Sequence, residues 1–147
     1  MTTDKIIELL SEFEPFKESD LENDNESFLN EIMAFLKSNN DYIKAIGPIF
    51  HLMEKYPHAD LGSPGPLVHT LEGFKGEYEN YLLDSLKRKP TPLTVWMLNR
   101  IINAEEALTA KKDLINLMSS LLQNQNIDDE TRTSIQDFIS FQMQSSS

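Results

Sequence analysis

The sequence contains no cysteine among its 147 residues. That absence excludes a disulfide framework, a thiol nucleophile and every zinc site that uses cysteine ligands. A domain of this length typically buries about 68 to 70% of the surface that its unfolded chain exposes, so it can build a hydrophobic core without cross-links. A chain without cysteine also suits a reducing compartment.

Long apolar runs are absent as well. The N-terminal segment 1–14 has an acidic residue, Asp4, near its start and shows neither the apolar core of a secretory signal nor the length of a membrane span. We therefore expect a cytoplasmic protein that has no membrane partner.

Basic residues are scarce: 13 Lys and Arg stand against 24 Asp and Glu, which gives a net charge of −11. A surface of this sign repels a nucleic-acid backbone, so we expect no nucleic-acid partner. It attracts a basic protein, although acidity also serves solubility alone. The acids concentrate in segment 11–31, where Lys17 is the single basic residue.

Strand signals are missing too, because no alternating apolar run is bounded by turn residues. Apolar residues instead recur at helical spacing, which predicts an all-α fold of about seven or eight helices in antiparallel hairpins. Such hairpins either stack as a HEAT-like α-solenoid or close into a compact helical bundle, and both remain open. We expect a single all-helical domain over residues 1–143 and a disordered polar tail over 144–147.

Capping and breaking residues set the expected helix bounds. Thr3, Asp41 and Thr91 are candidate N-caps, and either Asp24 or Asn25 caps the second helix. The third helix, from Asp41 to about residue 56, contains Gly47 and Pro48, which predict a kink or a helix restart. Its expected core residues are Ile43, Ile46, Phe50 and Met53.

No motif in the sequence predicts catalysis. A Gly-x-Ser-x-Gly elbow is absent, and the prolines of Gly62-Ser-Pro-Gly-Pro66 remove amide donors that a phosphate loop needs. His51, His58 and His69 lack the spacing of a helix-borne metal site. We therefore expect no enzyme activity, no metal and no cofactor, and we interpret segment 62–66 as a stiff turn.

Trp96 shares a helical stripe with Asn99, Arg100 and Asn103, and two interpretations apply to it. In the first, Trp96 is a core residue and Arg100 pairs with an internal carboxylate or with a helix end. In the second, the stripe contacts a partner, because tryptophan, tyrosine and arginine are common interface anchors. Asparagine is a poor helix former, so the amides of Asn99 and Asn103 are expected to make a specific hydrogen bond, which favours the second interpretation.

Part of the chain resembles the all-α immunity proteins encoded beside bacterial polymorphic and contact-dependent growth inhibition toxins. The residues that carry the resemblance are Gly62-Ser-Pro-Gly-Pro-Leu-Val-His69, Tyr78, Tyr81, Leu82, Ser85, Arg88, Pro90-Thr91 and Thr94-Val-Trp-Met-Leu-Asn-Arg-Ile-Ile-Asn103. They cover less than a third of the chain. The resemblance implies a protein without activity of its own that binds one cognate toxin domain, one to one, and blocks its active site.

Many toxins of such systems are nucleases, whose groove for the phosphate backbone must be basic. An acidic inhibitor fits such a groove, either directly over the active site or from beside it. The candidate toxin-binding residues are the acids Glu12, Glu18, Asp20, Glu22, Glu72, Glu77 and Asp84, the aromatic residues Tyr78, Tyr81 and Trp96, and the polar residues Asn99, Arg100 and Asn103. The alternative is a generic HEAT-like adaptor that binds proteins but has no toxin partner.

Overall fold

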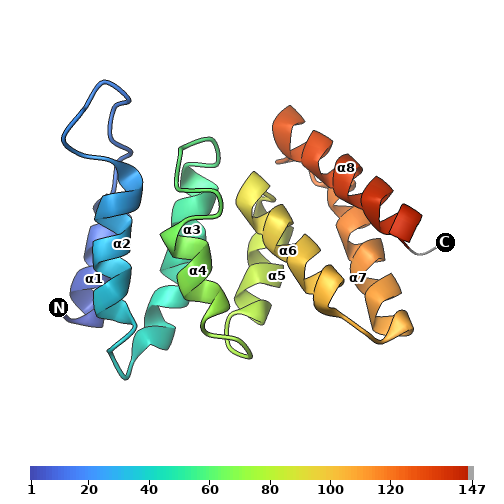
Figure 1. Ribbon diagram of the computed structural model, residues 1–147, viewed down its shortest axis with the longest axis horizontal. Coiled ribbons are helices and arrows are strands. Elements are labelled where there is room, and N and C mark those ends of the chain that lie inside the picture. The colour runs from blue at the N-terminus through green and yellow to red at the C-terminus, as the bar shows by residue number, and fades with distance from the viewer. Residues whose placement is uncertain (146–147) are drawn as a thin grey trace. The chain divides into compact units, whose positions relative to one another are not determined.

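The computed structural model describes residues 1–145 and confirms the all-α prediction (Figure 1). Over these residues the chain forms eight α-helices, two short 3-10 helices and no strand. The elements are α1 (Thr3–Glu12), α2 (Asn25–Leu36), η1 (Tyr42–Ala45), α3 (Ile46–Lys55), α4 (Pro66–Glu72), α5 (Glu79–Arg88), α6 (Pro92–Ala104), α7 (Leu108–Ser120), η2 (Leu121–Gln123) and α8 (Asp129–Ser145). Within the described part of the chain, no helix is both long enough and apolar enough to cross a membrane.

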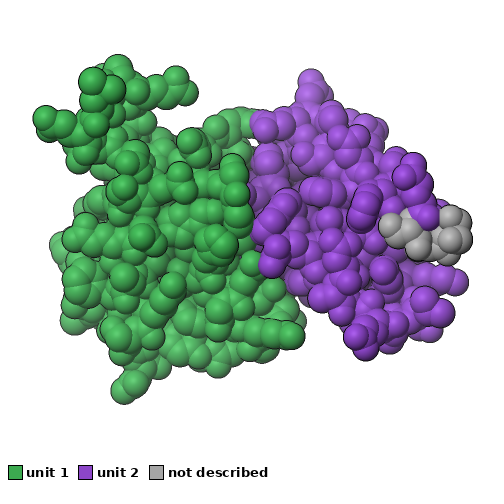
Figure 2. Space-filling view, viewed as in Figure 1, with its two compact units in different colours: residues 1–81 green, residues 82–147 purple. Residues whose placement is uncertain are grey.

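The chain divides into two compact units, coloured separately in Figure 2. Unit 1 comprises Met1–Tyr81 and unit 2 comprises Leu82–Ser147, so the boundary falls within α5. The single domain over residues 1–143 stays a prediction. Helix α8 extends into the expected polar tail as far as Ser145, and residues 146–147 lie outside the described part.

In unit 1, α1 and α2 each pack against the next helix but one along the chain. Helix α1 contacts α2 and α3, while α2 contacts α4, which is the pattern of two stacked helical hairpins. Its core contains fully buried side chains from each of these helices, including Ile6, Leu29, Phe50 and Leu71. The helices therefore bury one apolar face each, as the sequence spacing predicts.

The third predicted helix is split into η1 and α3. Pro48 lies in the first turn of α3, where an N–H group has no partner within the helix, so the proline is accommodated by a restart. A 3-10 helix has about three residues per turn rather than 3.6, which changes the face that its residues present. The assignment of Ile43 to the core was wrong for this reason: Ile43 is 44% exposed, whereas Ile46, Phe50 and Met53 are buried.

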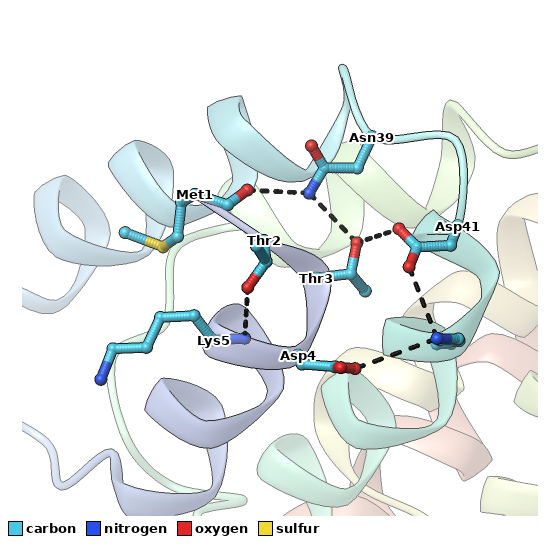
Figure 3. Close-up of polar contacts among 8 residues, drawn as sticks. Met1, Thr2, Thr3, Asp4, Lys5, Asn39 and Asp41 are labelled. Carbon is cyan, nitrogen blue, oxygen red and sulfur yellow. Dashed lines mark hydrogen bonds and ion pairs between the residues drawn. The ribbon is translucent and has the colours of Figure 1, made fainter.

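The N-terminus is held by polar contacts, shown in Figure 3. The side chain of Thr2 caps α1 by accepting from the Lys5 N–H, so the expected cap, Thr3, was wrong by one residue. Thr3 instead donates its hydroxyl to Asp41 Oδ1 at 2.5 Å and accepts from Asn39 Nδ2 at 3.1 Å. These bonds tie the start of α1 to the segment before η1.

The stiff turn before α4 depends on glycine. Gly62 and Gly65 have φ angles of 106° and 89°, a region that L side chains rarely adopt. A Cβ atom on Gly65 would lie 2.1 Å from the carbonyl oxygen of Leu61, and one on Gly62 would lie 2.2 Å from Gly65 Cα. The turn is therefore closed to any larger residue at either position.

Unit 2 is built on mutual contacts among α6, α7 and α8. Thr91 caps α6 in a capping box with Thr94, as the Thr91-Pro92 pair predicts. The core residues come from all three helices and include Leu98, Met118 and Ile135. This arrangement places the polar stripe of α6 beside α8.

Candidate protein-interaction surface

Four of the six candidate acids of unit 1 lie around the connection between α1 and α2. We call residues 13–24 the acidic loop. Glu12 ends α1, and Glu18, Asp20 and Glu22 lie on the acidic loop; all four side chains are exposed. The structure thus brings these four candidate acids together and places them in water, whereas Glu72 lies at the end of α4 and Glu77 between α4 and α5.

Asp20 organises the tip of the acidic loop. Its Oδ1 accepts from the N–H groups of Glu22 and Asn23, both at 3.1 Å, and its Oδ2 accepts from Asn23 Nδ2 at 3.3 Å. The bond from the Glu22 N–H, followed by those from Asn23, lowers the pKa of the Asp20 carboxyl below its ordinary value. Asp20 therefore keeps its negative charge at any physiological pH.

Asn25 fixes the base of the acidic loop, although the sequence indicated it only as a possible cap. Its Oδ1 accepts from the Phe16 N–H at 2.8 Å, and its Nδ2 donates to the Asp60 carbonyl at 2.9 Å. The side chain is buried, so these bonds are shielded from water. One amide thus joins the loop to a segment 35 residues further along the chain.

Charge is divided unevenly between the two units. Unit 1 carries 16 acidic and six basic residues, a net charge of −10, whereas unit 2 carries eight acidic and seven basic residues, a net charge of −1. The ion pairs of unit 1 join Lys5 to Glu8 and Lys44 to Asp4 and Asp41. Within residues 1–145, the acids between Glu12 and Glu31 take part in no ion pair, so their charge is available to a partner.

The other candidate residues of unit 1 lie at α4, at α5 and between them. Tyr78 is only 5% exposed, so its side chain is buried, whereas Tyr81 is 37% exposed. Glu77 accepts a hydrogen bond from the Tyr42 hydroxyl, which raises the pKa of Tyr42 above its ordinary value. Tyr42 also stacks on Phe74, with ring centroids 4.2 Å apart. Glu72 is partly buried on the last turn of α4.

The candidate residues of unit 2 follow α5 and α6. Asp84 is exposed on α5. Trp96 is half-buried, and the guanidinium of Arg100 lies over its ring, 4.7 Å from the centroid. Such a cation–π contact is expected for residues four apart on one helix face. The pair combines features of both interpretations, since Trp96 is half-buried while Arg100, which lies over its ring, is exposed.

Asn99 and Asn103 make a specific hydrogen bond, as the sequence predicts, but they make it within unit 2, which supports the structural interpretation of these two residues. Gln142 Nε2, on α8, donates to Asn99 Oδ1 at 2.9 Å and to Asn103 Oδ1 at 2.7 Å. Asn99 is 8% exposed and Gln142 is 1% exposed, so the network is internal to unit 2. The sequence could not identify Gln142, because one glutamine near the end of a helix resembles any other exposed amide.

The histidines do not come together in a site. His51, His58 and His69 are all exposed. Among residues 1–145, no three His, Asp or Glu side chains lie close enough together to hold a metal ion. His69 instead borders a hollow of about 370 Å³ beside the stiff turn, together with Lys37 and Glu26.

Comparison of the chain with protein-family models, with curated proteins and with solved structures finds no match.

Proposed function

We propose that this protein is an immunity protein: it binds one basic toxin domain, one to one, and blocks the active site of that domain in the cytoplasm. The observation that carries the proposal is the concentration of negative charge in unit 1, where the acids between Glu12 and Glu31 take part in no ion pair with any residue of the described range 1–145. The resemblance of segment 62–103 to immunity proteins supports it independently.

A nuclease is the toxin class that this charge fits best. Its groove must attract phosphates and therefore carries Lys and Arg. A net charge of −10 on unit 1 steers such a groove toward it over a distance of about one Debye length, roughly 8 Å at physiological salt. Binding there occupies the place of nucleic acid, and the inhibitor needs no catalytic group of its own.

The test is co-expression of this protein with the toxin domain encoded immediately upstream of it. We expect the protein to restore growth and to co-purify with the domain as a one-to-one complex, and to abolish nucleic-acid cleavage by the purified domain. Cell death despite soluble expression would overturn the proposal. Stable binding to a basic protein that is not toxic would favour the adaptor function instead.

A further inference from the structure

The acidic loop presents one apolar side chain to solvent. Leu21 is 97% exposed, more than any other large hydrophobic residue in the described part of the chain. Figure 2 shows the region of this loop standing out from the rest of unit 1. Burial of a leucine side chain is favourable, so Leu21 gains free energy from any partner that covers it.

Hydrogen bonds and a ring contact order the backbone of the acidic loop around Leu21. Asp20 accepts from the two N–H groups that directly follow Leu21, those of Glu22 and Asn23. At the base, the Phe16 ring packs edge-on against Phe28, with centroids 5.8 Å apart. A loop backbone that is already ordered loses little further conformational freedom on binding, which favours affinity.

Carboxylates surround Leu21. Glu18, Asp20, Glu22 and Asp24 lie within three residues of it and are all exposed. The loop also borders a hollow of about 480 Å³ whose lining includes Glu18, Asp20, Asp24, Glu26 and Asp60, with Lys17 as its one basic residue. An apolar centre ringed by one sign of charge is the complement of an apolar pocket ringed by the opposite sign.

We propose that Leu21 is the anchor of the toxin interface: it inserts into an apolar pocket of the toxin domain whose rim carries Lys and Arg side chains. These cations pair with the carboxylates of the acidic loop and enter the hollow beside it. The inference rests on the proposed function and assigns the contact to unit 1.

Charge selects this occupant over two others. An anionic membrane surface repels the carboxylates that flank Leu21, so a single leucine cannot hold the loop there. A second copy of the chain would bring two acidic loops together, and like charges disfavour that pairing. A basic protein surface satisfies both the leucine and the acids.

The experiment compares Leu21→Ser with Leu108→Ser, which changes a 77% exposed leucine of unit 2. The probe is the purified toxin domain encoded immediately upstream, made catalytically inactive, and the readout is its Kd and dissociation rate. We expect Leu21→Ser to raise Kd between about tenfold and a hundredfold, mainly through faster dissociation. Leu108→Ser should stay within about twofold, because that residue lies outside the proposed contact.

Because both leucines are exposed, both variants should keep the far-UV circular dichroism and the thermal midpoint of the unaltered protein. If the unaltered protein binds and Leu21→Ser binds equally well, the anchor inference is wrong while the proposed function stands. If the unaltered protein does not bind the domain, the proposed function and the anchor inference are both wrong.

Discussion

The two units of this chain use their polar residues differently. Unit 1 has a net charge of −10 and exposes acids on a long loop, whereas unit 2 has a net charge of −1 and directs amides inward, from Asn99 to Gln142. Both are all-helical, so helix content alone does not separate a surface that can recognise a partner from one that holds helices together. Under the proposed function, recognition therefore belongs to unit 1, whereas the amides of unit 2 serve internal packing.

The largest effect is expected from a substitution in the stiff turn of unit 1. It tests whether the stability of this highly charged unit depends on that turn. Gly65→Ala forces a side chain into a positive φ angle and against the Leu61 carbonyl. We expect it to lower the free energy of unfolding by about 3 kcal/mol or more, measured by urea denaturation. Gly76→Ala is the matched control: φ is 93° there, but the added Cβ meets open space, so the loss should be about 1 kcal/mol.

The same denaturation experiment can test whether the two units unfold independently. Trp96 is the only tryptophan and lies in unit 2, so its fluorescence follows unit 2 while circular dichroism follows every helix. If the Gly65→Ala variant begins to unfold at a lower urea concentration by circular dichroism than by fluorescence, unit 1 unfolds before unit 2. Coincident transitions would mean that the units unfold together.

The next largest effect is expected from charge reversal, which should slow association when it is made in unit 1 but not when it is made in unit 2. The triple variant Glu12→Lys, Glu18→Lys and Glu22→Lys should slow association with the toxin domain about tenfold or more and reduce its dependence on salt. The control reverses three exposed acids of unit 2, Glu106→Lys, Asp113→Lys and Asp137→Lys, for the same change in net charge. Stopped-flow association at several salt concentrations measures both, and equal slowing by the two variants would contradict the assignment of recognition to unit 1.

A smaller effect concerns the inward amides of unit 2. Asn99→Ala leaves a gap in a buried network and removes one acceptor of Gln142, so we expect a loss of about 1–3 kcal/mol in the free energy of unfolding. Asn103 is exposed, and Asn103→Ala should cost less than about 1 kcal/mol because water replaces the lost bond. Equal losses in thermal or urea unfolding would show that burial does not set the strength of these bonds.

The smallest effect is a shift in titration within unit 1. The hydroxyl of Thr3 lowers the pKa of the Asp41 carboxyl, so the folded state gains stability from this contact above the pKa of the unfolded chain and loses it as pH falls through the folded pKa. Thr3→Val should raise the pKa of Asp41 and weaken this dependence on acid. NMR titration of the carboxyl carbon measures the change, and an unmoved pKa would contradict the assigned cause.

Sequence periodicity predicted most of the fold because the cue is local. Thr91-Pro92 set the start of α6, and the spacing of Ile46, Phe50 and Met53 set the buried face of α3. Ile43 was misassigned because the change from 3-10 to α-helical geometry is not visible in the spacing of apolar residues. The division of the chain into units also depends on contacts between distant segments, which no local pattern encodes.

The candidate surface was predictable only in part. Charge density identified the acids around the acidic loop, since eight carboxylates in a short segment cannot all be buried. Tyr78 and Tyr81 carry the same residue type three positions apart, and only packing buries the first and leaves the second accessible. Leu21 was missed because an isolated leucine among acids shows no periodicity, and its exposure is known only from the fold.

The bond from Gln142 to Asn99 and Asn103 also fixes the register of α8 against α6. Apolar stripes tolerate a slide of one helical turn, because one buried leucine or isoleucine can replace another. The two donors of one amide meet two acceptors four residues apart in a single alignment, and a slide of one turn, about 5.4 Å, breaks both bonds. Unit 2 therefore contains a hydrogen-bonded amide that selects one alignment of α8 on α6 among several with similar apolar contacts.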